Sequence, residues 1–357
     1  MSLLQLREGL TSKDYNRSLD ALRGIAVSLV FLYHAKIPAF SGGFIGVEVF
    51  FVLSGFLITL VLLREELAKG KFDLSRFYMR RVLRLMPGFW FMILVFLCVC
   101  FFYFKEPVKL HLQLQDVLMA VLYVSNWTRA LDLNRPFILG HTWSLSIEEQ
   151  FYLVWPILLR WIRILPGINR ATAIGIAILI SWGWRLVLLN NGASWPRLYN
   201  GLDCRADMLL MGCLAAALWH TGQIDFRKHA RWVSFLLTGG AIGALTYIHV
   251  IADQYKAPIY VWEYEVVGLA TCVLILELVS FPEGIIAWLL NRKWLVWLGS
   301  ISYGIYLWHY PVLWFAESAG LPIAERAWVS AALTLLFAVI SWYGVERPFL
   351  HLKRRYS

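Results

Sequence analysis

Two ionisable side chains, Arg23 and His34, lie eleven residues apart in the first hydrophobic segment of this 357-residue chain. An ionisable group inside a bilayer is costly and tends to mark a substrate pathway or chemistry. On a helix the two residues would lie about 16 Å apart along the axis, roughly half the hydrocarbon thickness. One of them can therefore face the cytoplasm while the other works deeper in the membrane.

The side chain of His34 is suited to proton transfer. An imidazole titrates near neutral pH and can take a proton from one group and hand it to another, which Lys and Arg do poorly. The alternative is a core histidine that hydrogen-bonds a neighbouring carbonyl group. For Arg23 the corresponding alternative is an i,i+3 ion pair with Asp20 at the cytoplasmic interface.

A second group of ionisable residues follows the second hydrophobic segment and comprises Arg76, Arg80, Arg81 and Arg84. Their spacing predicts that three of the four share one face of a helix, where planar guanidinium groups can bind phosphates. A basic cytoplasmic anchor for the neighbouring spans explains part of this charge. Four arginines in nine residues, with no lysine among them, favour phosphate binding for at least two.

Polar residues near the outer ends of later segments form a third group. His141 and Trp143 precede the carboxylate pair Glu148 and Glu149, which could orient an imidazole, hydrogen-bond sugar hydroxyls or cap a helix N-terminus. Trp143 could stack on a sugar ring or simply occupy the membrane interface. His309 is expected to line the interior of the bundle. We predict that His141, Trp143 and His309 contact the acceptor, meaning the molecule whose hydroxyl a base at His34 would deprotonate. We also predict that the two carboxylates support catalysis.

Two further charged runs are predicted to have structural roles. Asp203, Arg205 and Asp207 are expected to form a local ion-pair network. Glu346 and Arg347, which precede Pro348, are expected to end a helix with a cytoplasmic ion pair.

The composition places the chain among integral membrane proteins. It is 59% hydrophobic, contains 18 Trp, 22 Phe and 16 Tyr, and has a mean hydropathy of +0.61. The formal charge of +10 could indicate nucleic acid or anionic lipid as a partner. Because the basic residues cluster in alternate loops, we assign the charge to membrane topology and predict contact with lipid rather than nucleic acid.

Hydrophobic stretches recur along the whole chain, which predicts one all-α integral-membrane domain over residues 1–357. The positive-inside rule places the basic loops and both termini in the cytoplasm if about ten helices span the membrane. The 111–128 stretch must then be a re-entrant or outer-surface helix. The predicted spans are 19–38, 44–64, 86–104, 147–165, 171–190, 204–221, 232–250, 261–280, 296–317 and 327–345.

Other site chemistries have no sequence signal. The five cysteines and eight histidines lack the spacing of a metal site, so no metal is expected. No glycine-rich phosphate-binding loop is present. The first apolar stretch lacks a small-residue cleavage site and carries Arg23 and His34, so we predict a retained helix rather than a signal peptide.

Several motifs, taken in order, resemble those of the membrane acyltransferase-3 family. The resemblance covers nearly the whole chain. The matching segments are SLDALRGIA at 18–26, YH at 33–34, GFIGVEVFFVLSGF at 43–56, RFYMRRVLR at 76–84, HTWSLSIEEQFY at 141–152, SYGIYLWHYP at 302–311 and VERP at 345–348.

The resemblance implies an enzyme of the bacterial inner membrane that transfers an acyl group, usually acetyl from cytoplasmic acetyl-CoA, to a hydroxyl of an extracytoplasmic glycan or related acceptor. His34 would act as general base, Arg23 would contact the donor, and the arginines at 76–84 would hold its phosphates. The family often has Asp where this chain has Glu48. Some relatives append a soluble esterase-like domain, whereas this chain ends at Ser357, so we expect the membrane domain or a partner to handle the acceptor.

Two other functions would suit a bundle of spanning helices with buried charge. A transporter or flippase would need no covalent step, but it usually shows related halves, and no convincing internal repeat occurs here. A glycan polymerase or ligase would need a lipid-linked sugar donor. Dependence on an acyl-CoA separates acyl transfer from both.

Overall fold

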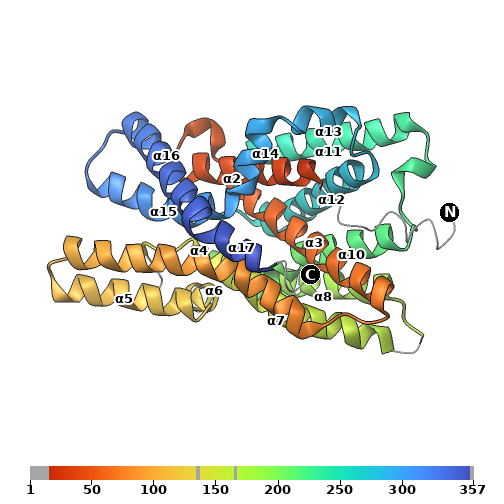
Figure 1. Ribbon diagram of the computed structural model, residues 1–357, viewed down its shortest axis with the longest axis horizontal. Coiled ribbons are helices and arrows are strands. Elements are labelled where there is room, and N and C mark those ends of the chain that lie inside the picture. Colours follow the sequence, from red (N-terminus) through yellow and green to blue (C-terminus); the bar gives the residue numbers. More distant parts are fainter. Residues whose placement is uncertain (1–15, 134–136, 165–166, 354–357) are drawn as a thin grey trace.

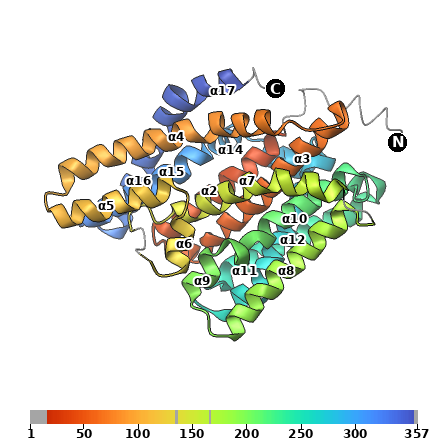
Figure 2. The same cartoon turned by 90° about the horizontal axis from the view of Figure 1, so that it is seen from below.

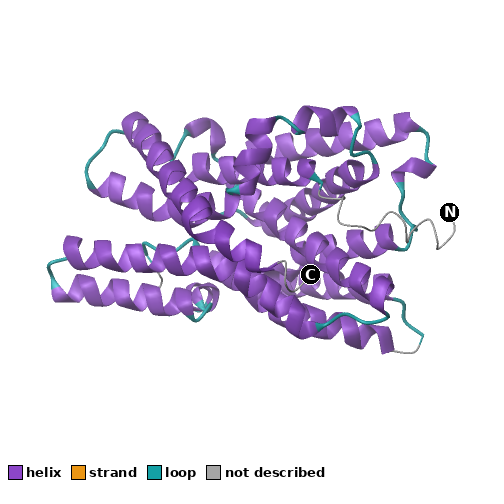
Figure 3. Cartoon of the chain, in the orientation of Figure 1, coloured by secondary structure: helices purple, strands orange, loops and turns teal. Residues whose placement is uncertain are grey.

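The computed structural model describes residues 16–133, 137–164 and 167–353. Within these ranges every regular element is a helix (Figure 3). The predicted all-α class is therefore confirmed. The predicted positions of the two chain ends lie outside the described residues.

The helices follow one another with short connections (Figure 1). The first half contains α2 (Arg17–His34), η1 (Pro38–Phe40), η2 (Gly43–Ile45), α3 (Gly46–Lys69), α4 (Leu74–Tyr103), α5 (Pro107–Val121), α6 (Ser125–Ala130), α7 (Thr142–Ile164) and α8 (Arg170–Asn190). The second half contains α9 (Trp195–Asn200), α10 (Leu202–His220), η3 (Phe226–Lys228), α11 (Arg231–Ile251), η4 (Ile259–Glu263), α12 (Tyr264–Ser280), α13 (Ile285–Leu290), α14 (Lys293–Ser300), α15 (Ser302–Ser318), α16 (Ile323–Ile340), η5 (Ser341–Glu346) and α17 (Arg347–Lys353).

The ten predicted spans fall on helices, with the span 296–317 divided between α14 and α15 at Ile301, but fewer pass a test of length and hydropathy. In the described part of the chain six stretches are long and apolar enough to cross a membrane. The helices α2, α7, α10 and α15 are not among them, because charged residues interrupt the first three and α15 has only 17 residues. The six stretches are Gly43–Lys69, Leu74–Tyr103, Arg170–Asn190, Arg231–Ile251, Ile259–Ser280 and Ile323–Leu352.

Three helix boundaries differ from the sequence-based expectation. The helix α4 begins at Leu74, so it carries the whole arginine group as well as an apolar half. The helix α7 begins at Thr142, which places Glu148 and Glu149 inside it and excludes a capping role for either. The expected helix stop at Pro348 is wrong, because α17 continues directly from the π-helical η5 and carries the helical run past the proline to Lys353.

Close packing of helix backbones forms the centre of the bundle. A Cβ added to Gly55 of α3 would lie 1.9 Å from the Leu209 carbonyl oxygen of α10, and one added to Gly212 would lie 1.9 Å from the Val52 carbonyl oxygen. Small residues at such positions let two helices approach closely. Gly55 and Gly212 therefore serve the packing of α3 against α10.

The periphery is formed by pairs of long helices. The helix α5 runs beside the second half of α4, and the 111–128 stretch expected to be a separate helix corresponds to α5 and α6 (Figures 1 and 2). The helix α17 lies along the first half of α4 (Figure 2). Gly88 of α4 faces the buried side chain of Glu346, whose carboxylate accepts a hydrogen bond of 2.8 Å from Ser341.

The charged residues of α10 pair with neighbouring helices, so the expected local network is wrong. Arg205 pairs with Glu48 of α3, and both side chains are fully buried. Asp207 pairs with Arg185 of α8 at 2.6 Å. Successive residues of a helix point in different directions, so each charge meets a different neighbour. The carboxylate of Glu48 therefore has a structural partner inside the bundle.

Candidate functional site

Three histidines from distant parts of the chain converge on one point, and we call them the histidine cluster: His34, His141 and His309. His34 ends α2 because Lys36 has a φ of 60° and Ile37, which precedes Pro38, is extended. His141 lies directly before α7, and His309 lies in the middle of α15. The sequence-based expectation that these residues share a site is consistent with this convergence.

Rings of the cluster are in contact. The ring centroids of His34 and His309 lie 5.0 Å apart, and those of His141 and His309 lie 5.4 Å apart. Tyr310 packs against the cluster, with its centroid 5.1 Å from that of His34 and 5.3 Å from that of His141. Neither ring nitrogen of the buried His141 has a hydrogen-bond partner among the described residues. His141 is therefore free to hydrogen-bond a ligand.

Tyr306 joins the cluster to a pocket. Its ring centroid lies 5.7 Å from that of His141 and 5.2 Å from that of His309. Its hydroxyl donates to the main-chain oxygen of His141 at 3.0 Å and lies 2.5 Å from the hydroxyl of Ser144. Both Tyr306 and Ser144 also line a pocket that is partly open to solvent. The pocket and the cluster are therefore adjacent.

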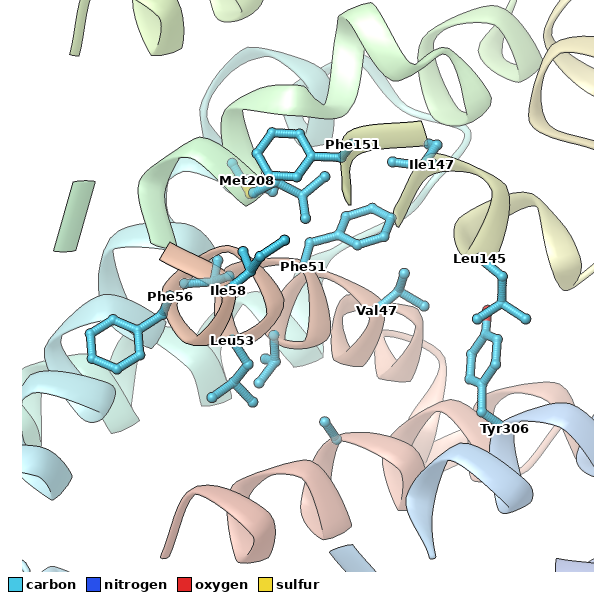
Figure 4. Packing of buried hydrophobic residues seen from close by; sticks show 14 of the residues in the cluster. Val47, Phe51, Leu53, Phe56, Ile58, Leu145, Ile147, Phe151, Met208 and Tyr306 are labelled. Atoms are coloured by element: carbon cyan, nitrogen blue, oxygen red, sulfur yellow. The ribbon is translucent and has the colours of Figure 1, made fainter. Parts of the chain in front are cut away.

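Basic side chains and a carboxylate line this pocket, which we call the arginine pocket: Arg23, Arg81, Arg84 and Glu148 are among its lining residues. Its apolar wall includes Val47, Leu145 and Tyr306, which belong to the buried hydrophobic core (Figure 4). Guanidinium groups beside an apolar wall suit a ligand that carries both phosphates and an uncharged arm.

Two of the four predicted phosphate-binding arginines lie elsewhere. Arg80 pairs with Glu65 of α3 at 2.9 Å, and Arg76 is exposed and lies 3.5 Å from Asp73. The other two, Arg81 and Arg84, line the pocket, and phosphate binding by at least two of the four stays a prediction. Arg81 also lies over the ring of Tyr152 at 4.5 Å.

Arg23 combines the two roles weighed from the sequence. It lies 3.9 Å from Asp20, at the outer limit of an ion pair, and it also lines the arginine pocket. An ion pair at that separation is weak. Arg23 therefore retains donors for a ligand in the pocket.

The two glutamates differ in their surroundings. Glu148 accepts hydrogen bonds from the Ser54 hydroxyl at 2.8 Å and from the Tyr152 hydroxyl at 3.3 Å, and it lines the pocket. Glu149 is half-buried and is not among the lining residues of the pocket. Of the two glutamates, therefore, Glu148 is the one that lines the pocket together with Arg23, Arg81 and Arg84.

Trp143 lies in an aromatic cluster rather than at an open surface. It is 6% exposed, with its ring centroid 4.7 Å from that of Tyr199 and 6.1 Å from that of Phe51. The stacking face that an acceptor sugar would need is therefore covered by protein in this conformation.

Sequence reasoning missed the hydroxyl groups that line the pocket: Ser54, Ser144, Tyr152, Ser302, Tyr303 and Tyr306. All six fall within the matching motif segments. Helical spacing could have identified two of them. Tyr152 follows Glu148 by four residues and Tyr306 precedes His309 by three, so each tyrosine lies on the same helix face as a predicted site residue. No group of three or more His, Cys, Asp or Glu residues that could hold a metal ion occurs among the described residues.

Comparisons with known proteins identify the family of this chain. The profile of the acyltransferase domain matches residues 16–346. The peptidoglycan O-acetyltransferase OatA of Listeria monocytogenes is 34% identical over 354 residues, covering 94% of this chain and 56% of that protein. The O-acetyltransferase OatA of Staphylococcus aureus is 33% identical over 356 residues, covering 96% of this chain and 58% of that protein. The chain thus spans little more than half the length of these relatives. No solved structure matches it.

The matched range includes the whole histidine cluster and every lining residue of the arginine pocket. It also includes six of the motif segments in full and the first part of the VERP segment. The chain therefore belongs to the acyltransferase-3 family of acyltransferase domains.

Proposed function

We propose that the protein is a membrane O-acetyltransferase that moves an acetyl group from cytoplasmic acetyl-CoA to a hydroxyl of an extracytoplasmic glycan. The observation that carries this proposal is the contact between the arginine pocket and the histidine cluster through Tyr306. One ligand can then place its phosphates on guanidinium groups and its acyl carbon near an imidazole.

The donor is proposed to bind with its charged end at Arg81 and Arg84 and its thioester arm along Arg23 toward Tyr306. Guanidinium groups bind phosphate oxygens through parallel hydrogen bonds. These hydrogen bonds stabilise the complex more strongly where water is partly excluded. Arg76 and Arg80 lie outside the pocket, where each has a carboxylate partner, and they take no part in donor binding. Acetyl-CoA is the donor class that this arrangement suits.

The chemistry needs a base for the attacking hydroxyl. We assign that base to His34, which takes the hydroxyl proton as the oxygen attacks the thioester carbonyl. The tetrahedral intermediate then collapses, the carbon–sulfur bond breaks, and the proton passes to the leaving thiolate. Glu148, held by Ser54 and Tyr152, balances the charge of the arginines and orients them.

The acceptor side is proposed to involve His141, whose unpaired ring nitrogens can hydrogen-bond an incoming hydroxyl. Relatives named for O-acetylation of peptidoglycan support a cell-envelope glycan as acceptor and the bacterial plasma membrane as location. Trp143 would contact the acceptor only after a rearrangement of Phe51 and Tyr199.

Radiolabelled acetyl-CoA tests this function directly. Membranes that contain the protein are expected to transfer label to extracted envelope glycans, and membranes from an empty-vector strain are not. Absence of label in the glycan fraction at matched protein levels would contradict acetyl transfer. Movement of an unmodified glycan in reconstituted vesicles, without label, would support a transporter instead.

A further inference from the structure

The side chain of His309 contacts His34 directly. Its Nε2 lies 3.2 Å from His34 Nδ1, and its Nδ1 lies 2.6 Å from the main-chain oxygen of Tyr306. The ring is fully buried. Both of its nitrogens therefore face protein atoms, which leaves neither for the acceptor contact expected from the sequence.

These contacts define where the protons lie. A carbonyl oxygen only accepts hydrogen bonds, so His309 Nδ1 carries the proton and Nε2 of the neutral ring presents a lone pair. His34 Nδ1 also lies 3.0 Å from the main-chain oxygen of Val30. It must therefore donate as well, and its proton is shared between that carbonyl and His309 Nε2. The lone pair of His34 then lies on Nε2.

We propose that His309 is a positioning residue that, together with the Val30 carbonyl oxygen, holds the ring of His34 so that Nε2 is the atom that takes the acceptor proton. This inference rests on the proposed function. During transfer the hydroxyl proton moves to His34 Nε2 and then to the thiolate, while the Nδ1 proton stays in its bond to His309. His309 remains neutral throughout and stabilises the transient imidazolium by accepting that bond.

Main-chain oxygens of α2 and α15 hold the two imidazole rings in place. Nδ1 of His34 reaches back to the carbonyl of Val30, one turn earlier in α2, and Tyr306 lies one turn before His309 in α15. Each imidazole is therefore held by the backbone of its own helix, and the two helices are packed together. The relative position of α2 and α15 sets the geometry of the pair.

A matched pair of substitutions tests the proposal: His309→Gln and His309→Met have similar length and volume, but only glutamine offers an oxygen that accepts from His34 Nδ1. We expect His309→Met to lower kcat about 100-fold while KM for acetyl-CoA stays within about twofold, and His309→Gln to recover at least about tenfold of that loss. His249→Gln serves as control, because His249 also faces a carbonyl oxygen but lies outside the cluster.

The outcomes separate this inference from the proposed function. Equal kcat values for the Met and Gln variants, at equal folded levels, would overturn the positioning role. So would a wild-type kcat for His309→Met. A parallel His34→Ala variant that is inactive shows that the proposed base stands even if the His309 inference fails, whereas an active His34→Ala variant would remove the base and the inference together.

Discussion

At the scale of single residues, the structure selects among side chains that the sequence could only group. Helical spacing predicts that several of the four arginines share a face, and it cannot tell which carboxylate each one meets. Glu65 of α3 engages Arg80, which leaves Arg81 and Arg84 to line the pocket. Residue type and spacing thus predicted a group of arginines on one helix, while the partner helix α3 decided which of them line the pocket.

Neutralising the pocket arginines is expected to weaken donor binding. We predict that Arg81→Gln and Arg84→Gln each raise KM for acetyl-CoA about tenfold or more, because each removes a charge-assisted hydrogen bond of about 1.5–3 kcal/mol. Arg76→Gln is the matched control, since Arg76 is exposed and outside the pocket. Steady-state kinetics in membranes check this. Equal KM values for the pocket variants and the control would contradict the donor assignment.

The cluster shows a second limit of sequence reasoning at this scale. The motifs marked His34, His141 and His309 as candidates, and the structure brings all three together. The hydrogen bonds that distinguish a base from its support depend on Val30 and Tyr306 main-chain oxygens. No residue type encodes such a contact, so the roles of the histidines could not be separated from the sequence.

At the scale of elements, close helix contacts through glycine fix the positions of the site-bearing helices. The helix α3 carries Ser54 and Val47 of the pocket and packs on α10 through Gly55 and Gly212. The helix α2, which carries Arg23 and His34, packs on α14, where a Cβ added to Gly299 would lie 1.7 Å from the Asp20 carbonyl oxygen. Backbone atoms cannot yield as a flexible side chain can, so these contacts are sensitive to a single methyl group.

A methyl group at Gly212 is expected to destabilise the bundle. We predict that Gly212→Ala lowers the free energy of unfolding by about 3 kcal/mol, because its Cβ would lie 1.9 Å from the Val52 carbonyl oxygen. Gly183→Ala in α8 is the control, since no atom lies within 4 Å of its added Cβ and alanine favours a helix by about 1 kcal/mol. Thermal unfolding of the purified protein in detergent checks both. A Gly212→Ala variant as stable as the control would contradict the packing account.

Hydropathy located the helices well and their ends less well. All ten expected spans fall on helices, because apolar stretches of that length bury their backbone only as helices. The start of α7 at Thr142 was missed, since polar residues there are satisfied locally: the Thr142 hydroxyl donates to the Leu139 carbonyl at 2.7 Å. The continuation of the helix through Pro348 was not predicted, because a proline usually ends a helix and the π-helical segment η5 that precedes it was not expected.

At the scale of the whole molecule, the site lies within one all-helical bundle. Six stretches of the described chain are long and apolar enough to cross a membrane. The helices α2, α7, α10 and α15 do not meet that criterion, and each packs against at least one of the six stretches. The ten-span topology with both termini in the cytoplasm stays a prediction based on the basic loops. If it holds, the arginine pocket opens toward the cytoplasm and the histidine cluster lies nearer the outer side.

The most direct test of the account places donor and acceptor on opposite sides of the membrane. Inverted vesicles that enclose envelope glycan, with radiolabelled acetyl-CoA added outside, are compared for the wild-type chain, His34→Ala and the control His111→Ala at matched protein levels. The account predicts label on the enclosed glycan for the wild-type and control chains and a loss of about 100-fold or more for His34→Ala. Equal label with His34→Ala, or label only after the vesicles are opened, would contradict transfer at His34 from a cytoplasmic donor.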